Sequence, residues 1–187
     1  TMGSTKDLSR GIFIRHQGQL CRVVEKQHTM PGKGGAFYQV KMKNAITGKS
    51  MDWRFRSGET IDIVRVEEKE MQYLYRDGEH YACMDNTTYE QVIVDKDAVG
   101  DMAKWVIENA TVSVLFWNGR AITLEVEKQV VFKITECEPG VKGDTAQGAT
   151  KPATLETGAI VNVPLFVNEG ESIKVDTRTG QYLERSN

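Results

Sequence analysis

Apolar and polar residues alternate along much of this chain, and pairs of turn-forming residues interrupt the alternation. In residues 51–56, 112–116 and 122–126, every second side chain is apolar. This period of two places one face of a strand inward. Turn pairs separate the strand-like runs: Gln17-Gly18, Thr47-Gly48, Asp77-Gly78, Asn118-Gly119 and Thr179-Gly180. Glycine adopts positive φ without strain, so these pairs favour tight hairpins. The pattern predicts an all-β protein of short antiparallel strands.

One stretch, residues 97–109, has a helical pattern instead. Its apolar residues Val99, Met102 and Val106 recur at three- and four-residue spacing, with Trp105 beside them. Such a stripe is typical of a helix that packs against a core. We therefore expect one short helix in the chain, lying within this stretch.

Domain boundaries are indicated by two charged clusters, at residues 67–70 and 127–129. The chain has 187 residues, which suffices for one or two domains of ordinary size or for three small ones. Short strands with tight turns are typical of barrels or sandwiches. Residues 138–152 are rich in Gly, Thr and Pro and are too many for a hairpin turn, so either a functional loop or a mobile one is expected there.

Charge is distributed unevenly along the chain, although the net charge is only −2. Residues 1–65 hold twelve Lys and Arg against five Asp and Glu, whereas residues 66–128 hold six against thirteen. Residues 129–187 hold six against eight. A basic segment favours a phosphate backbone as partner, and an acidic one disfavours it. The first third of the chain is therefore the expected nucleic-acid-binding part, unless the charge merely fluctuates along the chain.

The expected compartment is the cytoplasm. The sequence has no apolar run long enough for a membrane span and no apolar signal-peptide core near its beginning. Its cysteines, Cys21, Cys83 and Cys137, are odd in number and form no CxxC pair. This favours free thiols in a reducing compartment.

The motifs of common enzyme classes are missing from the sequence. Residues 48–50 read Gly-Lys-Ser, but the glycine that a phosphate-binding loop needs five positions earlier is Lys43. His80 and Cys83 would face opposite sides of a strand, and no second pair of metal ligands follows. We therefore expect no catalytic residues, no metal and no cofactor, and a binding protein rather than an enzyme.

The most distinctive local motif is a lysine set in a turn of proline and glycine: Pro31, Gly32, Lys33, Gly34 and Gly35. Proline fixes its own φ and glycine permits φ > 0, so the segment favours a tight reversal with the lysine at its tip. Such a lysine is either an ordinary solvated turn residue or a functional group presented to a partner.

Four blocks in order along the chain, residues 31–34, 139–146, 151–170 and 175–182, resemble the bacterial translation elongation factor P family. The resemblance implies three consecutive small β-barrels, a KOW/SH3-like N-terminal barrel followed by two OB-fold barrels. The implied domains are residues 1–66, 67–128 and 129–187. It also implies a monomer that binds both subunits of the ribosome near the exit site.

The same resemblance implies that the factor stimulates peptide bond formation at consecutive prolines. Lys33 would lie beside the CCA end of the peptidyl-tRNA in the P site, and orientation would supply the rate gain while the ribosome performs the chemistry. A lysine-modifying enzyme is expected to act on Lys33, by β-lysylation or by adding an aminopentanol group.

Further contacts to ribosomal RNA or tRNA are implied in the C-terminal domain. The loop residues Gly143, Asp144 and Thr145 would approach the exit-site codon, because small residues permit close approach to RNA. The other candidates are cations and one aromatic residue: Lys142, Lys151, Arg178, Tyr182 and Arg185.

A general single-stranded RNA-binding OB-fold protein is the alternative. Such proteins need a basic groove with stacking aromatic residues. The second and third segments of this chain are acidic or near neutral, and Trp105 and Trp117 lie in apolar surroundings where they are expected to be core. The alternative is therefore the less favoured one.

Overall fold

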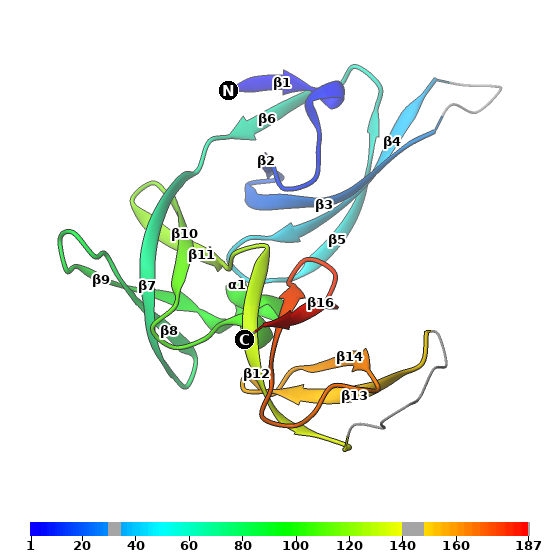
Figure 1. Ribbon diagram of the computed structural model, residues 1–187. Coiled ribbons are helices and arrows are strands. Elements are labelled where there is room, and N and C mark those ends of the chain that lie inside the picture. Colours follow the sequence, from blue (N-terminus) through cyan, green and yellow to red (C-terminus); the bar gives the residue numbers. More distant parts are fainter. Residues whose placement is uncertain (30–34, 140–147, 187) are drawn as a thin grey trace.

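The computed structural model describes residues 1–29, 35–139 and 148–186, and within these residues the strands form three antiparallel sheets in chain order. Figure 1 shows the sheets as three consecutive bodies, with the second between the other two. The prediction of an all-β fold is confirmed.

The first sheet contains β1 (Met2–Ser4), β2 (Phe13–His16), β3 (Gln19–Thr29), β4 (Phe37–Asn44), β5 (Ser50–Arg56) and β6 (Thr60–Val64). Its order is β1-β6-β2-β3-β4-β5. A 3-10 turn, η1 (Thr5–Asp7), follows β1 and leads to the buried Leu8. The inward residues of the alternating strands form its core, among them Val40, Met42 and Phe55.

The second sheet contains β7 (Glu67–Asp77), β8 (His80–Met84), β9 (Gln91–Asp95), β10 (Thr111–Trp117) and β11 (Arg120–Glu125). Its order is β11-β10-β7-β8-β9, and the two outermost strands, β11 and β9, also lie against each other. This contact closes the sheet around its own apolar core, as expected for a barrel.

The third sheet contains β12 (Gln129–Cys137), β13 (Thr150–Leu155), β14 (Ile160–Pro164), β15 (Ser172–Asp176) and β16 (Gln181–Ser186). Its order is β14-β13-β12-β15-β16, and its end strands β14 and β16 are again in contact. The core includes Phe132, Ile134 and Ile173, all fully buried.

The predicted short helix is present. α1 (Lys96–Val99) gives way to the 3-10 segment η2 (Gly100–Trp105), and Val106 is already extended. Gly100 has φ 57° and ψ −135°, outside the helical region, which ends α1 after one turn. The helical segments α1 and η2 thus occupy the first part of the predicted stretch, and the residues from Val106 onward are not helical.

The apolar stripe of that segment joins the second and third cores. Met102 packs against both clusters, and Trp105 is buried in the third. The hydroxyl of Thr157 donates a hydrogen bond to the carbonyl of Lys104 at 2.5 Å, and that of Thr177 donates to the carbonyl of Glu127 at 2.7 Å. Packing and hydrogen bonds together hold the second and third bodies against each other.

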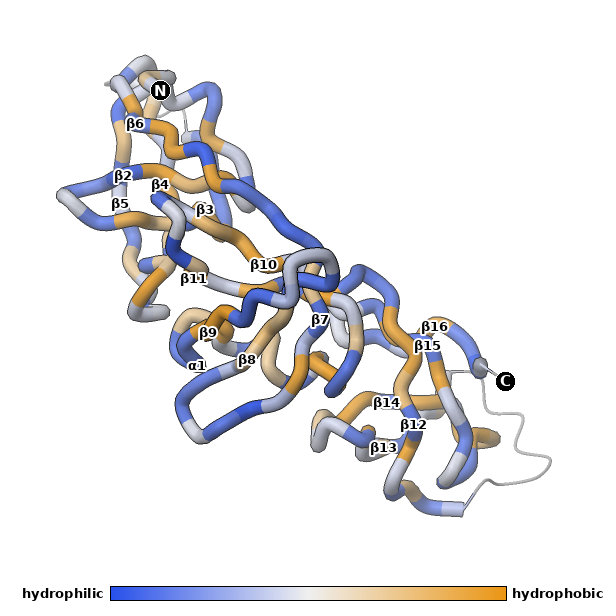
Figure 2. Tube along the Cα trace, turned by 90° about the vertical axis from the view of Figure 1, so that its left-hand side faces the viewer, coloured by the Kyte–Doolittle hydropathy of each residue, from blue (hydrophilic) through white to orange (hydrophobic). Residues whose placement is uncertain are grey.

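A separate apolar cluster lies between the first and second bodies. It contains Phe13 and Leu20 from the first and Leu115 and Ile122 from the second, with Trp117 partly buried beside them. Figure 2 shows apolar stretches of β3 and β10 in this region. Arg22 also forms an ion pair with Glu125 across the junction. Packing and this ion pair therefore fix the first barrel on the second. The hairpin of β3 and β4 belongs to this first barrel.

Candidate nucleic-acid interface

The predicted lysine turn lies between β3 and β4. Pro31, Gly32, Lys33 and Gly34 are outside the described residues, so their predicted role stays a prediction. Gly35 is described and exposed, and a Cβ built on it would have no neighbour within 4 Å. The described residues therefore leave room for a larger side chain at this position.

The two strands that flank the turn carry an aromatic stack on one face. The rings of His28 and Tyr38, cross-strand partners, lie 4.3 Å apart with an interplanar angle of 14°. The ammonium of Lys26 lies 5.1 Å from the centre of the Tyr38 ring and donates a hydrogen bond to the carbonyl of Leu8 at 2.6 Å. These contacts connect the outer part of the hairpin to the buried Leu8.

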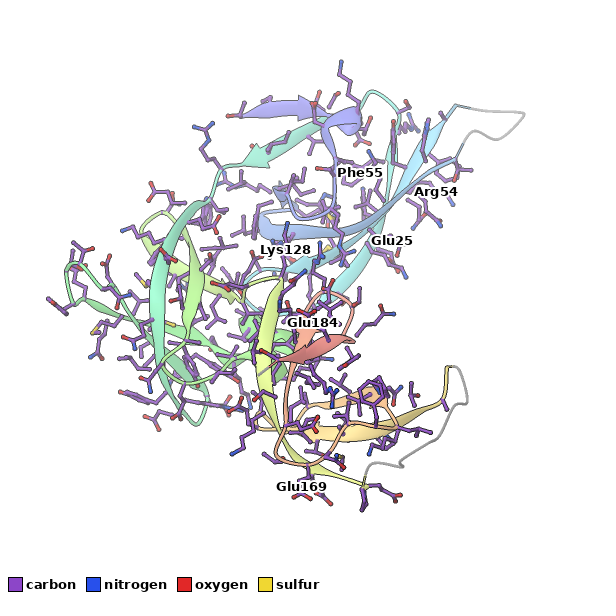
Figure 3. All side chains as sticks on the ribbon, viewed as in Figure 1. Glu25, Arg54, Phe55, Lys128, Glu169 and Glu184 are labelled. Carbon is purple, nitrogen blue, oxygen red and sulfur yellow. The ribbon has the colours of Figure 1, made fainter. Side chains whose placement is uncertain are left out.

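The opposite face of the hairpin carries a second cation and ring. The guanidinium carbon of Arg54 lies 4.2 Å from the centre of the Phe37 ring. The amide of Ser57 donates to the carbonyl of Ala36 at 3.0 Å, which holds the beginning of β4. Figure 3 shows Arg54 nearer the outer end of the hairpin than Glu25.

Exposed positive charge therefore lies on the strands near the lysine turn. Arg54 and Arg56 are exposed, and the Lys41 ammonium is 3.9 Å from the Glu25 carboxylate, a long and exposed pair. Exposed pairs of this kind contribute little stability. These groups remain available to bind phosphate, as the basic composition of the first third suggested.

Part of the second predicted set of site residues lies outside the described range. Lys142, Gly143, Asp144 and Thr145 lie outside it, between β12 and β13, and their role stays a prediction. Lys151 is on β13 and is only 7% exposed.

The position of Lys151 corrects the expectation of a surface phosphate contact. Its ammonium donates a hydrogen bond to the carbonyl of Glu138 at 2.5 Å. Residues 151, 153 and 155 share the inward face of β13, which is why this lysine is buried. Lys151 therefore ties the two ends of the segment 139–149 together.

Arg178 is exposed but already paired with a neighbour. Its Nε and Nη2 donate to the two carboxylate oxygens of Asp176 at 3.1 Å and 2.9 Å. The hydrogen bond from the guanidinium lowers the pKa of the Asp176 carboxyl. An RNA phosphate at Arg178 would have to compete with this carboxylate.

Tyr182 and Arg185 lie on β16. Tyr182 is partly buried against the third core, and this burial raises the pKa of its hydroxyl. The Arg185 guanidinium is 4.8 Å from the Phe166 ring centre and 3.8 Å from a Glu171 carboxylate oxygen. Phe166 is 51% exposed, so this cation and ring form a surface feature.

The structure does not bring all of the C-terminal candidates together. Asp176, beside Arg178, pairs with Gln129 at the beginning of β12, whereas the segment 139–149 follows Cys137 at its other end. Nine residues of strand separate these ends, a span of roughly 25 Å. Arg178 therefore lies about a strand length away from Lys151, whose ammonium binds the Glu138 carbonyl just beyond Cys137.

The most complete part of the interface was missed from the sequence. Four residues on the strands near the lysine turn were not predicted as site residues: His28, Phe37, Tyr38 and Arg54. Their signal in the sequence is the placement of aromatic residues on both sides of the Pro-Gly turn. That placement acquires meaning only once the register pairs His28 with Tyr38.

Among the residues that the structure describes, no helix is long and apolar enough to cross a membrane. The same residues contain no group of three or more His, Cys, Asp or Glu side chains arranged to hold a metal ion.

Three consecutive β-barrel domains with a cationic hairpin on the first define a class of proteins that bind RNA through barrel surfaces. Sequence models of one family match the chain in the same order. These are the elongation factor P KOW-like domain at residues 4–61, the elongation factor P OB domain at 66–124 and the elongation factor P C-terminal domain at 130–185. The chain belongs to the elongation factor P family of translation factors.

Relatives match over essentially their whole length. The chain is 50% identical to elongation factor P of Coprothermobacter proteolyticus, covering 98% of this chain and 99% of the relative. It is 48% identical to elongation factor P of Syntrophomonas wolfei, covering 98% and 100%. A solved structure, eukaryotic translation initiation factor 5A from Methanococcus jannaschii, aligns with a TM-score of 0.51 at 18% identity, covering 65% of this chain and 90% of that one. This last likeness concerns the fold alone.

Proposed function

We propose that this protein acts on ribosomes stalled at consecutive prolines, where it stimulates peptide bond formation by holding the CCA end of the P-site peptidyl-tRNA. Family membership over the full chain is the observation that carries the proposal. The cationic hairpin of the first barrel supports it, because that hairpin flanks Lys33 and has exposed groups suited to phosphate.

The contribution of the factor is orientation. Proline is a poor nucleophile in peptide transfer because its amine is secondary and its ring is constrained. Holding the peptidyl end in a reactive geometry lowers the entropic part of the barrier, and the ribosome performs the reaction itself. The factor is therefore not an enzyme, and its action should need neither a nucleotide nor a metal.

The three domains have different tasks in this proposal. We set their boundaries near residues 66 and 128, in the short connections between β6 and β7 and between β11 and β12. The first domain contacts the acceptor end of the tRNA. The third contacts RNA near the exit-site codon through residues 142–145, with Arg185 and Tyr182 as further contacts. The acidic second domain spaces the two.

Lys33 is proposed to be extended by a modifying enzyme of the host cytoplasm, in which the factor acts as a monomer. The mass of protein purified from its own host tests this. The intact protein should be heavier than its sequence requires, and the increment should lie on the peptide that contains Lys33. An unmodified mass in fully active protein would contradict it.

Peptide synthesis on a Pro-Pro-Pro template, in a reconstituted system that lacks this factor, tests the function. Adding the protein should restore synthesis, and a template without consecutive prolines should be little affected. If the purified protein hydrolyses nucleotide in step with rescue, the proposal of a non-enzymatic factor fails. Binding to mixed single-stranded RNA as tight as binding to stalled ribosomes would instead favour a general RNA-binding protein.

A further inference from the structure

The outer part of β3 differs from the rest of the first sheet in how it is held. β3 pairs with β2 only through residues 19–22, whereas β4 is paired along its length with β5, up to Phe37 and Arg56. Among the described residues, Glu25–Thr29 therefore have one strand neighbour, β4. This is the arm that leads directly into the segment containing Lys33.

A strand with one neighbour is easily bent or frayed, so the backbone pairing leaves the direction of this arm loosely defined. Side chains supply what the pairing lacks. His28 stacks on Tyr38, a residue of the well-paired β4, and the same ring lies beside the Lys26 ammonium.

The contacts continue from the hairpin into the core of the barrel. Lys26 donates to the carbonyl of Leu8, which is 1% exposed and follows η1. The buried Thr5 hydroxyl of η1 accepts a hydrogen bond from the amide of Gly58 at 2.8 Å. Neighbouring Ser57 donates to Ala36 at the beginning of β4. Both arms of the hairpin are thus tied, directly or through a neighbour, to the region around η1.

We propose that His28 and Lys26 are positioning residues for Lys33: they fix the direction of the β3 arm by stacking on Tyr38 and by binding the Leu8 carbonyl. The inference rests on the proposed function, because it assumes that Lys33 acts by its position. Groups that act through orientation lose effect when their support loosens by a fraction of an ångström.

The test uses the saturating rate of Pro-Pro-Pro synthesis and the factor concentration that gives half of it, measured separately. His28 is exposed, so His28→Ala removes the stack without removing a core residue. We expect a saturating rate lower by about threefold to tenfold, the range of one aromatic pair, with the half-saturating concentration unchanged. His28→Phe keeps a ring over Tyr38 and should restore the rate.

Two further variants complete the design. Gln27→Ala changes the adjacent exposed residue and should leave both parameters unchanged. Lys26→Met keeps the length of the side chain but removes the donor to Leu8, and should lower the saturating rate as His28→Ala does. In both His28→Ala and Lys26→Met, amide hydrogen exchange should accelerate in residues 26–29 while the rest of the first barrel keeps its protection.

The outcomes separate this inference from the proposed function. If Lys33→Ala is inactive but His28→Ala keeps the full saturating rate, the positioning role is overturned and the function stands. A rise in the half-saturating concentration alone also overturns it, since His28 would then be a binding contact. If Lys33→Ala rescues fully, the proposed function fails whatever the His28 variants do.

Discussion

The hairpin of the first barrel and the base of the segment 139–149 in the third barrel differ in where their cations lie. On the hairpin, Arg54 and Arg56 are exposed, and Lys26 is only partly buried, with its ammonium beside an aromatic ring and bound to the Leu8 carbonyl. At the base of the third-barrel segment, Lys151 is buried and its ammonium is bound to a backbone carbonyl. One region keeps positive charge on its surface, and the other uses it inside the fold.

The difference teaches that closeness to a functional loop in sequence does not make a cation a contact residue. Whether a lysine faces solvent depends on whether its position falls on the inward or the outward face of its strand, and on what covers that face. A buried ammonium must find an acceptor, because leaving it unpaired is costly. In the third barrel that acceptor is the carbonyl of Glu138.

The largest effect is expected at the first loop. Lys33→Ala should abolish rescue at consecutive prolines. The free energy of unfolding should change by no more than about 0.5 kcal/mol, the usual range for an exposed residue, which the sequence predicts Lys33 to be. Lys33→Arg should also fail, because the guanidinium is planar and bulkier and a lysine-specific modification cannot be installed on it. Rescue assays and thermal unfolding measure both quantities.

The control for this pair is Lys6→Ala, which removes an exposed lysine from η1 of the same barrel. It should retain full rescue. Full rescue by Lys33→Ala would mean that Lys33 is an ordinary turn residue. The contrast between the two regions would then say nothing about function.

The second prediction concerns stability in the third barrel. Lys151→Met removes the donor to Glu138 and leaves a carbonyl without its partner, which should lower the free energy of unfolding by about 1–3 kcal/mol. Denaturant unfolding followed through the third domain measures this. Lys133→Met, at an exposed position on the adjacent strand β12, should have little effect. Weaker ribosome binding by Lys151→Met at unchanged stability would instead restore the phosphate contact first expected.

The third prediction compares the three cores by the reactivity of their cysteine thiols, for which a smaller effect is expected. Cys21 and Cys83 are fully buried, and burial raises the pKa of both thiols, that of Cys83 to about 11. Cys137 is partly exposed at the end of β12. A maleimide at neutral pH should therefore label Cys137 first, as peptide mass analysis would show. Lys151→Met should accelerate that labelling, whereas equal rates for all three thiols would contradict the packing.

The smallest effect is a pH dependence confined to the first barrel. His16 lies against Trp53 and Phe55 at centroid distances of 4.6 and 5.4 Å, and burial lowers its pKa below 6.5, partly offset by Glu59. Because the folded pKa is the lower one, the unfolded state binds the proton first as pH falls. Stability should therefore decrease below pH 6.5, until the folded pKa is passed.

His16→Phe should reduce this decrease, because it keeps a ring at the position and removes the titrating group. Unfolding free energies of both proteins between pH 7.5 and 5, roughly the range in which an ordinary histidine titrates, give the difference. Identical pH profiles would show that His16 does not contribute, and that carboxylates alone set the acid sensitivity.

Much of the fold followed from local sequence. Gly18, Gly48, Gly78, Gly119 and Gly180, from the predicted turn pairs, all have positive φ. Gln17 and Asn118 also have positive φ, as a type I′ turn requires. The sequence located the short helix, but not that the stripe from Val99 to Val106 is shared between two cores, because a pattern of apolar spacing does not distinguish one partner from two.

The candidate site was predictable only in part. The burial of Lys151 could have been predicted from the sequence, because residues 151, 153 and 155 lie at a period of two on β13. The stack of His28 on Tyr38 was not, since it depends on a register shift between Val23 and Glu25 that decides which residues of β3 and β4 are opposite. A one-residue change there would place different side chains together.

The sequence by itself determined the turns, the alternation within strands and the family, because these depend on backbone preferences and on residues that are neighbours in the chain. The tertiary structure alone decided which strands pair, in which register, and which acceptor each buried or partly buried ammonium binds. These depend on contacts such as Lys26 with Leu8 and Lys151 with Glu138, between residues 18 and 13 positions apart. Such contacts form only when packing of the whole barrel brings the partners together. A local sequence pattern does not determine that packing.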